Sequence, residues 1–421
     1  MLRSLIITNE GFPRSNEDAA GGLVRLRRFI GAIASLGSDI EILHFVPAKF
    51  LANAPSQGTL DRTGSDYWGH RVKVLLVPLS RRPKTHFNHY ISPLFSALEH
   101  HYFYDFSTDL QAQGVRSALA QRTDLVFVHR LAAMCPLLLS QERPPRVFFD
   151  LDDVEHKARL RAALSPPIWP GKLAYAAQTI AIHAKERQAA RLAAATFVCS
   201  ELDRRYLARL GVRNVRVVPN AVTLPDQVVP AVAERTLLFI GNFNHTPNIG
   251  AAERLVRDIW PLVQARVPSA RLLIAGRPPE LLPSFGAAPQ GVDYLGFVED
   301  LTALYARSRV VCCPMIVGGG TRVKLIEAGA HAKPMVSTRI GAEGLDFVPE
   351  REILIRESDS DVAAACIHLL EDDAACKSIG MAARARAEQA YAAPIVERRI
   401  AELLTERLSA DVVRCAAGSR H

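Results

Sequence analysis

The 421-residue sequence has no run of about 18 uncharged apolar residues, so it predicts no helix that spans a membrane. Its first residues, MLRSLIIT, contain only a short apolar stretch and lack the hydrophobic region of a signal peptide, so we interpret them as a buried strand. The seven cysteines form no Cys-x-x-Cys pair, which argues against a structural zinc site and favours a reducing, cytoplasmic location. We interpret Cys312 and Cys313, which lie in an apolar run, as small buried hydrophobic residues.

Hydrophobic residues make up 49% of the chain and charged residues 22%, which is ordinary for a soluble α/β protein. The length allows two domains of about 200 residues, each with its own core. Residues 1–222 carry 29 Lys and Arg against 19 Asp and Glu, a net charge of +10, whereas residues 223–421 carry 22 against 24. This asymmetry indicates either an anionic partner (nucleic acid, a membrane surface or a phosphorylated acceptor) or a solvated basic face without function.

Short apolar runs rich in β-branched residues alternate with helical patterns, which is typical of βαβ units and a parallel sheet. We expect strands at residues 4–8, 39–45, 73–79, 124–129, 146–151, 195–200, 215–220, 236–241, 270–276, 292–297, 310–314 and 334–338. Leu23, Leu26, Ile30 and Ile33 recur at helical spacing and predict a helix that Gly37 closes. Further helices are expected at residues 173–195, 249–265, 300–307, 321–332 and onward to about residue 409, before a frayed tail.

The pattern restarts after NAVTLPDQVVPAVAER, a proline-containing stretch that we interpret as an interdomain linker. We therefore predict an N-terminal acceptor-binding domain over residues 1–222 and a linker over 223–234. A C-terminal domain follows over 235–395, and residues 396–421 form a helix and tail that return toward the first domain. Both domains should be doubly wound, so ligands are expected at the carboxyl ends of the strands, in the crevice between the two sheets.

One stretch of the second half, PMIVGGGTRVKLIEAGAHAKPMVST (314–338), joins a bare glycine loop to a helix. We expect Gly318–Gly320 to follow a buried strand and Thr321 to be the N-cap of the helix. A helix N-terminus presents free N–H groups to an anion, and glycines let that anion approach closely. Lys324 and Glu327 are three residues apart and share one helix face. The pattern is compatible with a nucleotide-sugar pocket, but glycine-rich turns between a strand and a helix are common, so on the residues alone a plain tight turn is the favoured interpretation.

The same stretch resembles the C-terminal signature of retaining GT-B glycosyltransferases of family 4, or group 1, of the subgroup associated with bacterial exopolysaccharide biosynthesis. The matching segments are GGGTRVKLIEA, PMVST, IGAEGL, LLFIGNFNHTPNIGAAERLVRDIWPLVQARVPSARLLIAG, LGFVEDLTALYARSRVVCCP, and VCSELDRRYL with VRVVPNAV. They cover most of residues 196–395, and the resemblance is weaker over residues 1–195. It implies two Rossmann-like domains facing across a cleft. It also implies a retaining hexosyltransferase that moves a sugar from a nucleoside-diphosphate sugar to a hydroxyl of a glycan or lipid-linked acceptor, without a cofactor or bound metal.

The resemblance also implies roles for single residues. Glu327 matches the second glutamate of the family's Glu-x7-Glu motif, which holds the donor ribose, whereas Gly319 stands in place of the first. Asn242 and Asn248 stand where most members place an Arg and a Lys on the diphosphate, so Arg322 and Lys324 are expected to supply that charge. The expected catalytic residues are His129, Lys324 and Arg322. The expected donor-binding residues are Gly21, Gly22, Gly241, Asn242, Gly276, Arg277, Phe297, Gly319, Gly320, Thr321 and Glu327.

Simpler interpretations of some positions stay open. The strand-end His129 is structural in one alternative, and Gly21 and Gly22, which precede a helix, form only a capping turn in another. The acidic group Asp150, Asp152, Asp153 and Glu155 suggests a metal site, or the Asp-x-Asp motif of the GT-A fold. We favour a helix cap that lines the acceptor cleft. The aromatic and basic residues 81–106 predict docking on a membrane or lipid-linked acceptor, with a packed helical region as the alternative.

Three other functions compete with sugar transfer. A non-hydrolysing sugar-nucleotide epimerase shares the architecture, but we find no acid and base carboxylates for it. A dinucleotide-dependent oxidoreductase is disfavoured because no Gly-x-Gly-x-x-Gly follows the first strand. A nucleic-acid or membrane-binding scaffold is suggested by the basic first half alone. We expect no nucleic-acid partner, and contact with the inner face of the membrane stays an open alternative.

Overall fold

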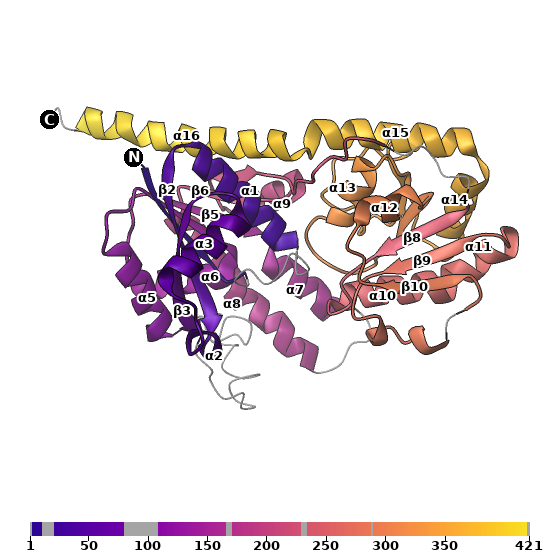
Figure 1. Cartoon of the computed structure of the whole chain (residues 1–421), viewed down its shortest axis with the longest axis horizontal. Coiled ribbons are helices and arrows are strands. Elements are labelled where there is room, and N and C mark those ends of the chain that lie inside the picture. The colour runs from indigo at the N-terminus through magenta and orange to yellow at the C-terminus, as the bar shows by residue number, and fades with distance from the viewer. Residues whose placement is uncertain are drawn as a thin grey trace. The chain divides into compact units, whose positions relative to one another are not determined.

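The computed structural model describes residues 2–10, 21–79, 108–165, 171–228, 234–287 and 289–418. The chain divides into two compact units, which we call the N-terminal unit (Met1–Pro219 with Val396–His421) and the C-terminal unit (Asn220–Ile395). Each unit is built around one sheet flanked by helices (Figure 1). The predicted α/β class with two Rossmann-like domains is therefore confirmed. The segment 81–106, for which a docking role was predicted, lies outside the described residues.

The sheet of the N-terminal unit is parallel throughout, with the strand order β3-β2-β1-β4-β5-β6-β7. Its strands are β1 (Leu2–Thr8), β2 (Ser38–Pro47), β3 (Val72–Leu79), β4 (Leu125–His129), β5 (Val147–Asp152), β6 (Ala195–Val198) and β7 (Val215–Val217). Both faces of such a sheet are covered, and the strands are therefore hydrophobic along their whole length rather than at alternate positions.

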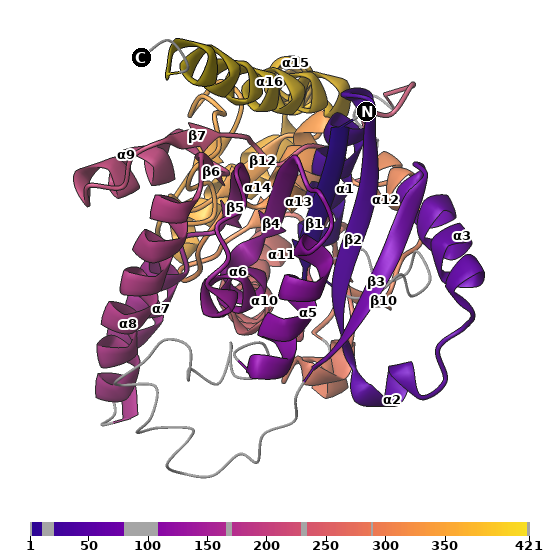
Figure 2. The same cartoon turned by 90° about the vertical axis from the view of Figure 1, so that its left-hand side faces the viewer.

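Helices flank this sheet (Figure 2). They are α1 (Gly21–Ser35), α2 (Ala48–Leu51), α3 (Gln57–Trp68), α5 (Asp109–Leu119), α6 (Arg130–Ser140), α7 (Glu155–Leu164), α8 (Gly171–Leu192), α9 (Glu201–Arg209) and α16 (Ala393–Gly418). Leu5 and Ile7 share a buried cluster with residues of α5, α6 and α8. Phe127 of β4 instead contacts Phe29 of α1, with ring centroids 4.6 Å apart. Two corrections concern helix ends: α1 begins at Gly21, so the two glycines do not precede it, and α16 runs on to Gly418 instead of ending near residue 409.

The sheet of the C-terminal unit is also parallel, with the order β10-β9-β8-β11-β12-β13. Its strands are β8 (Thr236–Ile240), β9 (Arg271–Ala275), β10 (Val292–Gly296), β11 (Val310–Cys313), β12 (Met335–Ser337) and β13 (Leu354–Ile355). The flanking elements are α10 (Thr246–Arg254), the π-helical turn η5 (Leu255–Ile259), α11 (Trp260–Arg266), the short 3-10 turns η6 (Pro279–Leu281) and η7 (Phe285–Ala287), α12 (Leu301–Ala306), α13 (Val323–Ala330), α14 (Asp359–Glu371) and α15 (Asp373–Ala390). Every strand predicted from the sequence is present, and β13 is additional.

Each strand order reverses direction at one point, where chain connections leave toward opposite edges of the sheet. In the N-terminal unit this point lies between β1 and β4, and Thr8 pairs with His129 there. In the C-terminal unit it lies between β8 and β11. Ligands of open parallel sheets bind at the carboxyl ends of the strands at such a switch point. The residues just beyond these four strand ends are therefore the first place to look for a site.

Within the described ranges, no helix is long and apolar enough to cross a membrane. The six cysteines described there (Cys135, Cys199, Cys312, Cys313, Cys366 and Cys376) are buried and form no disulfide with one another. Cys312 and Cys313 belong to β11 and are both 0% exposed, so the prediction that they are buried core residues is confirmed.

Candidate active site

The glycine loop lies at the carboxyl end of β11, as predicted. Gly318 and Gly320 have φ angles of +135° and +69°, a backbone region that residues with a Cβ rarely adopt. The guanidinium of Arg322 donates from Nη1 to the carbonyls of Gly319 and Gly320, and from Nη2 to Ile340 at 3.4 Å. Its Nε is buried and has no hydrogen-bond partner among the described residues. Arg322 therefore stabilises the conformation of the glycine loop and also places positive charge next to it.

The helix after the loop begins one residue later than the sequence suggested. Arg322, with extended angles of −91° and 94°, occupies the N-cap position of α13. The prediction that Thr321 is the N-cap is therefore wrong. The Thr321 hydroxyl instead accepts a hydrogen bond of 2.9 Å from Nδ2 of Asn220. This bond fixes the end of the glycine loop against the first residue of the C-terminal unit.

Lys324 lies on the first turn of α13, and its ammonium group is fixed by two contacts. Nζ donates to Oδ1 of Asn248 over 2.8 Å, and it lies 4.4 Å from the ring centroid of Phe239. Burial lowers the pKa of Lys324. Asn248, at which the resemblance led us to expect a cation, is thus the residue that positions the cation supplied from another element.

A histidine that the sequence analysis missed reports the electrostatic potential at this place. His245 directly precedes α10, and its pKa is lowered first by burial and then by the positive charges of Arg322 and Lys324. A group whose cationic form is disfavoured in this way marks a region of positive potential. Such a region, beside the backbone N–H groups of a glycine loop, favours an anion.

Glu327 lies one turn further along α13 and is held by an aromatic hydroxyl. Tyr305 of α12 donates its hydroxyl to Oε2 of Glu327 at 3.3 Å. Burial raises the pKa of Glu327 to about 7, an effect that Tyr305 and Lys324 partly offset. The carboxyl group is therefore poised between its neutral and ionised forms near neutral pH, so a ligand that donates hydrogen bonds to it would favour ionisation.

The neighbouring strand ends supply the other expected donor-binding residues. Gly276, directly after β9, approaches Gly241, directly after β8, so closely that a Cβ at position 276 would lie 1.7 Å from the carbonyl oxygen of Gly241. No side chain fits there, and the two loops form one continuous backbone surface. After β10, Phe297 is 45% exposed, and the Arg277 guanidinium lies 4.5 Å from the centroid of its ring. The side chain of Asn242 accepts a hydrogen bond of 2.9 Å from the Asn244 backbone, and its carbonyl accepts one of 2.9 Å from Nδ2 of Asn248.

In the N-terminal unit, His129 ends β4 at the switch point and is 0% exposed. Its Nδ1 lies 3.0 Å from Oδ2 of Asp150, and its Nε2 has no hydrogen-bond partner in the part of the chain that the structure describes. Arg25 of α1 donates hydrogen bonds of 2.6 to 3.1 Å to the carboxylate of Asp150. It also donates one of 2.7 Å to the carbonyl of Val218. A fixed carboxylate therefore orients the imidazole, and its Nε2 lies 3.8 Å from Oε1 of Glu10.

A second charged group surrounds His129. Arg130, which has a φ of +70°, pairs with Glu10 at 2.6 Å and with Asp152 at 2.9 Å. Gly22 leaves the space for this guanidinium, because a Cβ at that position would lie 2.5 Å from Nη2 of Arg130. Gly21 is the first residue of α1. The sequence analysis missed Glu10, Arg25 and Arg130, because nothing in their local patterns links them to His129.

The acidic group at the end of β5 and the start of α7 does not supply the helix N-cap, so that part of the prediction is wrong. Asp150 and Asp152 are instead neutralised by Arg25 and Arg130, while Val154 occupies the N-cap position of α7. Asp152, Asp153 and Cys199 are close enough together to suggest metal ligands. However, Asp152 is already held by two guanidinium groups, and their charges keep its pKa below the usual range despite burial. Asp152 is thus already paired with two arginine cations.

We expect Arg25→Ala to destabilise the N-terminal unit by about 3–5 kcal/mol, because it leaves Asp150 buried without its cation. The exposed Arg122, which pairs with Asp124 at 3.3 Å, is the matched control and should cost about 1 kcal/mol or less when replaced by alanine. Calorimetric unfolding of both variants checks this. Equal small losses in the two would show that the Arg25–Asp150 pair does not stabilise the unit.

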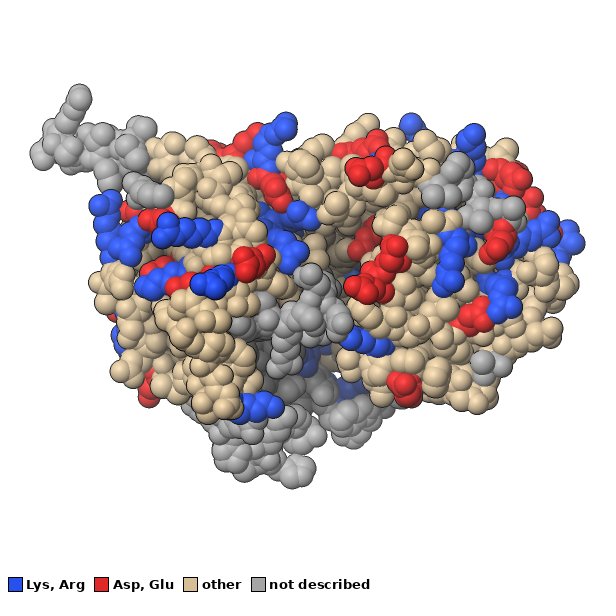
Figure 3. Space-filling view, viewed as in Figure 1, with Lys and Arg blue, Asp and Glu red and all other residues tan. Residues whose placement is uncertain are grey.

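A hollow of about 1020 Å³ in the N-terminal unit lies at the opposite edge of its sheet, where β1, β2 and β3 begin. Its lining mixes acidic and basic residues, and Lys73 pairs with Glu41 across 2.8 Å. Lys and Arg side chains are likewise interspersed with Asp and Glu over the face drawn in Figure 3. The hollow is therefore remote from His129, and its walls do not present charge of one sign.

Residues 234–372 match the model of a family described as Glycosyl transferases group 1. A search of curated protein sequences found no significant match. Among solved structures, sucrose-phosphate synthase from Thermosynechococcus elongatus is similar, with a TM-score of 0.70 and 17% identity, over 97% of this chain and 100% of that one. Anabaena HepE in complex with UDP and glucose has a TM-score of 0.62 at 14% identity, over 96% and 100% of the two chains. S. aureus TarM, solved with UDP, has a TM-score of 0.62 at 11% identity, over 97% and 100%.

The structural similarity and the family match each indicate the class of protein. The structural similarity shows that the chain has the two-domain architecture of GT-B proteins. The family match falls on the C-terminal unit, over the glycine loop, Lys324 and Glu327. Together they support a glycosyltransferase of GT-B fold.

Proposed function

We propose that the protein is a retaining hexosyltransferase of family 4 that transfers a sugar from a nucleoside-diphosphate sugar to a hydroxyl acceptor. The observation that carries this proposal is the arrangement on α13. A cation fixed by Asn248, a carboxyl group fixed by Tyr305 and the N–H groups of a glycine loop meet beside one strand end. HepE, a protein of similar fold, was solved with UDP-glucose, which supports a nucleotide sugar as the donor.

The donor would lie along the carboxyl edge of the second sheet. Lys324, Arg322 and the N–H groups of Gly319 and Gly320 suit the diphosphate, since each supplies positive charge or a donor. Glu327 suits the two ribose hydroxyls as an acceptor. The exposed ring of Phe297 and the guanidinium of Arg277 offer a flat surface for the base.

The chemical step would be a same-face displacement at the anomeric carbon. The bond from that carbon to the diphosphate oxygen breaks, the acceptor oxygen forms a new bond on the same face, and the leaving diphosphate takes the acceptor's proton. The protein's contribution is then electrostatic, because Lys324 and the loop N–H groups stabilise the negative charge that grows on the diphosphate. The N-terminal unit binds the acceptor, and its buried His129 Nε2 contacts the transferred sugar near the reacting carbon.

His129→Ala should lower kcat about tenfold to a hundredfold while the donor's affinity changes little, because the imidazole contacts the sugar and not the nucleotide. The steady-state kinetics of transfer and the calorimetric Kd for the donor check this. His70→Ala is the control, since His70 is exposed and lies outside the site. Unchanged kcat for His129→Ala would make the buried histidine a purely structural residue.

A screen of UDP- and GDP-linked sugars for thermal stabilisation of the purified protein tests the function first. One or a few nucleotide sugars should raise the Tm, and the product formed with a polysaccharide or lipid-linked acceptor should keep the donor's anomeric configuration. Conversion of the nucleotide sugar to an epimer without any acceptor would point to an epimerase instead. The likeness of the motifs to the exopolysaccharide subgroup supports a role in surface glycan assembly.

A further inference from the structure

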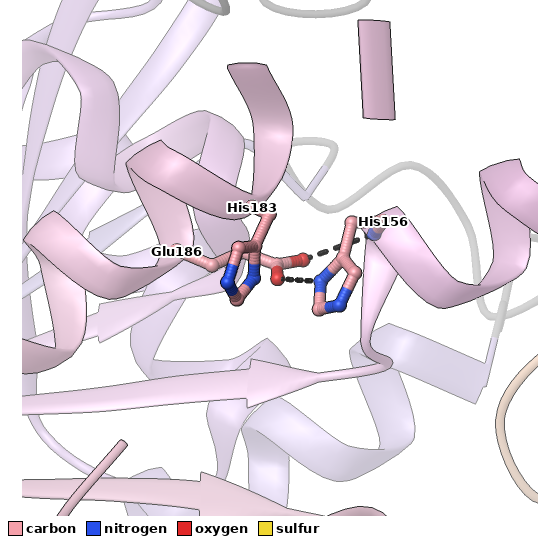
Figure 4. A group of neighbouring side chains, drawn as sticks. All are labelled: His156, His183 and Glu186. Carbon is pink, nitrogen blue, oxygen red and sulfur yellow. Dashed lines mark hydrogen bonds and ion pairs between the residues drawn. The ribbon is translucent and has the colours of Figure 1, made fainter. Parts of the chain in front are cut away.

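Helices α7 and α8 of the N-terminal unit bring two histidines and a glutamate together. His156 comes from the first turn of α7, while His183 and Glu186 come from one face of α8, three residues apart. Figure 4 shows the two imidazoles beside the carboxylate of Glu186. One nitrogen of each imidazole and one carboxylate oxygen all lie within 4.8 Å of one another. This spacing is small enough for the three atoms to bind a single ion.

The contacts around His156 resemble those of a metal-binding histidine. Its Nδ1 contacts Oε2 of Glu186, and its Nε2 lies 2.9 Å from the hydroxyl of Tyr206 on α9. Metal-binding histidines commonly place their second ring nitrogen on such a polar group, which fixes the tautomer and the orientation of the ring. The other oxygen of Glu186 accepts the backbone N–H of His156 at 3.2 Å. In His156 and in Glu186, one candidate ligand atom therefore faces the other residue, while the second polar atom of the side chain is held by a hydrogen bond.

His183 provides the observation that a simple ion pair does not explain. Its ring centroid lies 4.5 Å from that of His156, and its Nδ1 is buried without a hydrogen-bond partner among the residues described. A buried ring nitrogen without a partner costs free energy. Burial and the neighbouring His156 also lower the pKa of His183. The neutral imidazole is the form that binds metal ions.

The charges nearby are compatible with a divalent cation. Glu155, next to His156, has its pKa raised to about 8 by burial and by the charge of Glu186, while Arg130 and Arg159 act in the opposite direction. Arg187 on α8 disfavours a second positive charge on His183. Charges of both signs therefore lie near the cluster, and the carboxylate of Glu186 is the acidic group that faces the two imidazoles.

We propose that His156, His183 and Glu186 bind one zinc-class divalent transition metal ion, with water as the fourth ligand. Two imidazoles and one carboxylate are a ligand set that Zn²⁺ accepts in tetrahedral geometry, leaving one position open. The ion would join α7 to α8 beyond the carboxyl end of β5. None of its ligands is among the donor-binding residues, and the site does not depend on the proposed transfer reaction.

The test is a titration of the chelator-treated full-length protein with Co²⁺, whose visible absorption reports tetrahedral coordination, followed by displacement with Zn²⁺. We expect one equivalent to bind and Zn²⁺ to raise the Tm. His183→Ala should weaken binding by about tenfold or more and abolish the Tm shift, and Tyr206→Phe should weaken binding less. His183 is the principal variant because its Nδ1 makes no hydrogen bond to another described residue, so its removal should leave the fold intact.

His70→Ala, which removes an exposed histidine of the same unit, should bind Co²⁺ like the wild type. Circular dichroism of the metal-free variants checks that each is folded. The proposal is overturned if the folded wild type gives no tetrahedral Co²⁺ spectrum. It is equally overturned if His183→Ala keeps the wild-type affinity, because the cluster would then be a buried ion pair only.

Discussion

Lys324→Ala should lower kcat for sugar transfer by about 10²–10³-fold, the loss typical of removing one group that stabilises charge in the transition state. The reason is geometric as well as electrostatic. Nζ is anchored to Asn248 at 2.8 Å and rests over Phe239 at 4.4 Å, so the ammonium group is already in place before the donor arrives. Its charge should matter most when the diphosphate leaves.

The matched control is Lys377→Ala, which removes an exposed lysine from α15 of the same unit and should leave kcat unchanged. Steady-state kinetics with a stabilising nucleotide sugar measure both variants. Asn248→Ala should give a smaller loss, because the cation stays but its anchor is removed. If Lys324→Ala keeps kcat within a factor of about two while Tm is unchanged, Lys324 does not act on the diphosphate.

Glu327 predicts a pH dependence of donor binding. Its pKa is raised to about 7, and the ionised form is the acceptor that ribose hydroxyls require. Donor affinity should therefore fall as the pH falls through 7, by about 30-fold between pH 8 and pH 5.5 if only the ionised form binds. The effect on folding stability has the opposite sign. Because folding raises the pKa of Glu327, this residue contributes stability at pH values below the ordinary carboxyl pKa, and that contribution is lost as the pH rises through about 7.

Calorimetric titration with a nucleotide sugar across this pH range measures the effect, since its diphosphate diester does not titrate there. Glu327→Ala should weaken donor binding and abolish most of the transfer activity at pH 8. Glu327→Gln should remove the pH dependence of donor binding. A slope that persists in Glu327→Gln would assign the titration to another group, such as His245.

The sheets could be predicted from the sequence because their strands are buried on both faces and therefore read as continuous apolar runs. The two-residue strand β13 could not be predicted, since a run of that length has no periodicity. The prediction that Thr321 is an N-cap failed for a different reason. A threonine before a helical pattern is a common cap, but here the hydroxyl is bonded to Asn220, which is 101 residues away.

Part of the site was predictable from local spacing, and part was not. Lys324 and Glu327 follow a glycine loop within a few residues, so the pattern itself places them on one helix face. The groups that position them come from distant segments: Asn248 is 76 residues from Lys324. Likewise, Arg25 forms hydrogen bonds with Asp150, which is 125 residues away in the sequence. Asp150 in turn orients His129. Such pairs arise only when the sheet brings strand ends together, and a single sequence carries no signal for them.

The central claim is that α13 and the glycine loop bind the diphosphate and ribose of a sugar donor. The most direct measurement is calorimetric binding of a stabilising nucleotide sugar to the wild type and to the double variant Lys324→Ala/Glu327→Ala, with both proteins folded at the assay temperature. We predict saturable binding by the wild type and no measurable heat from the double variant. Equal affinities in the two proteins would contradict the account.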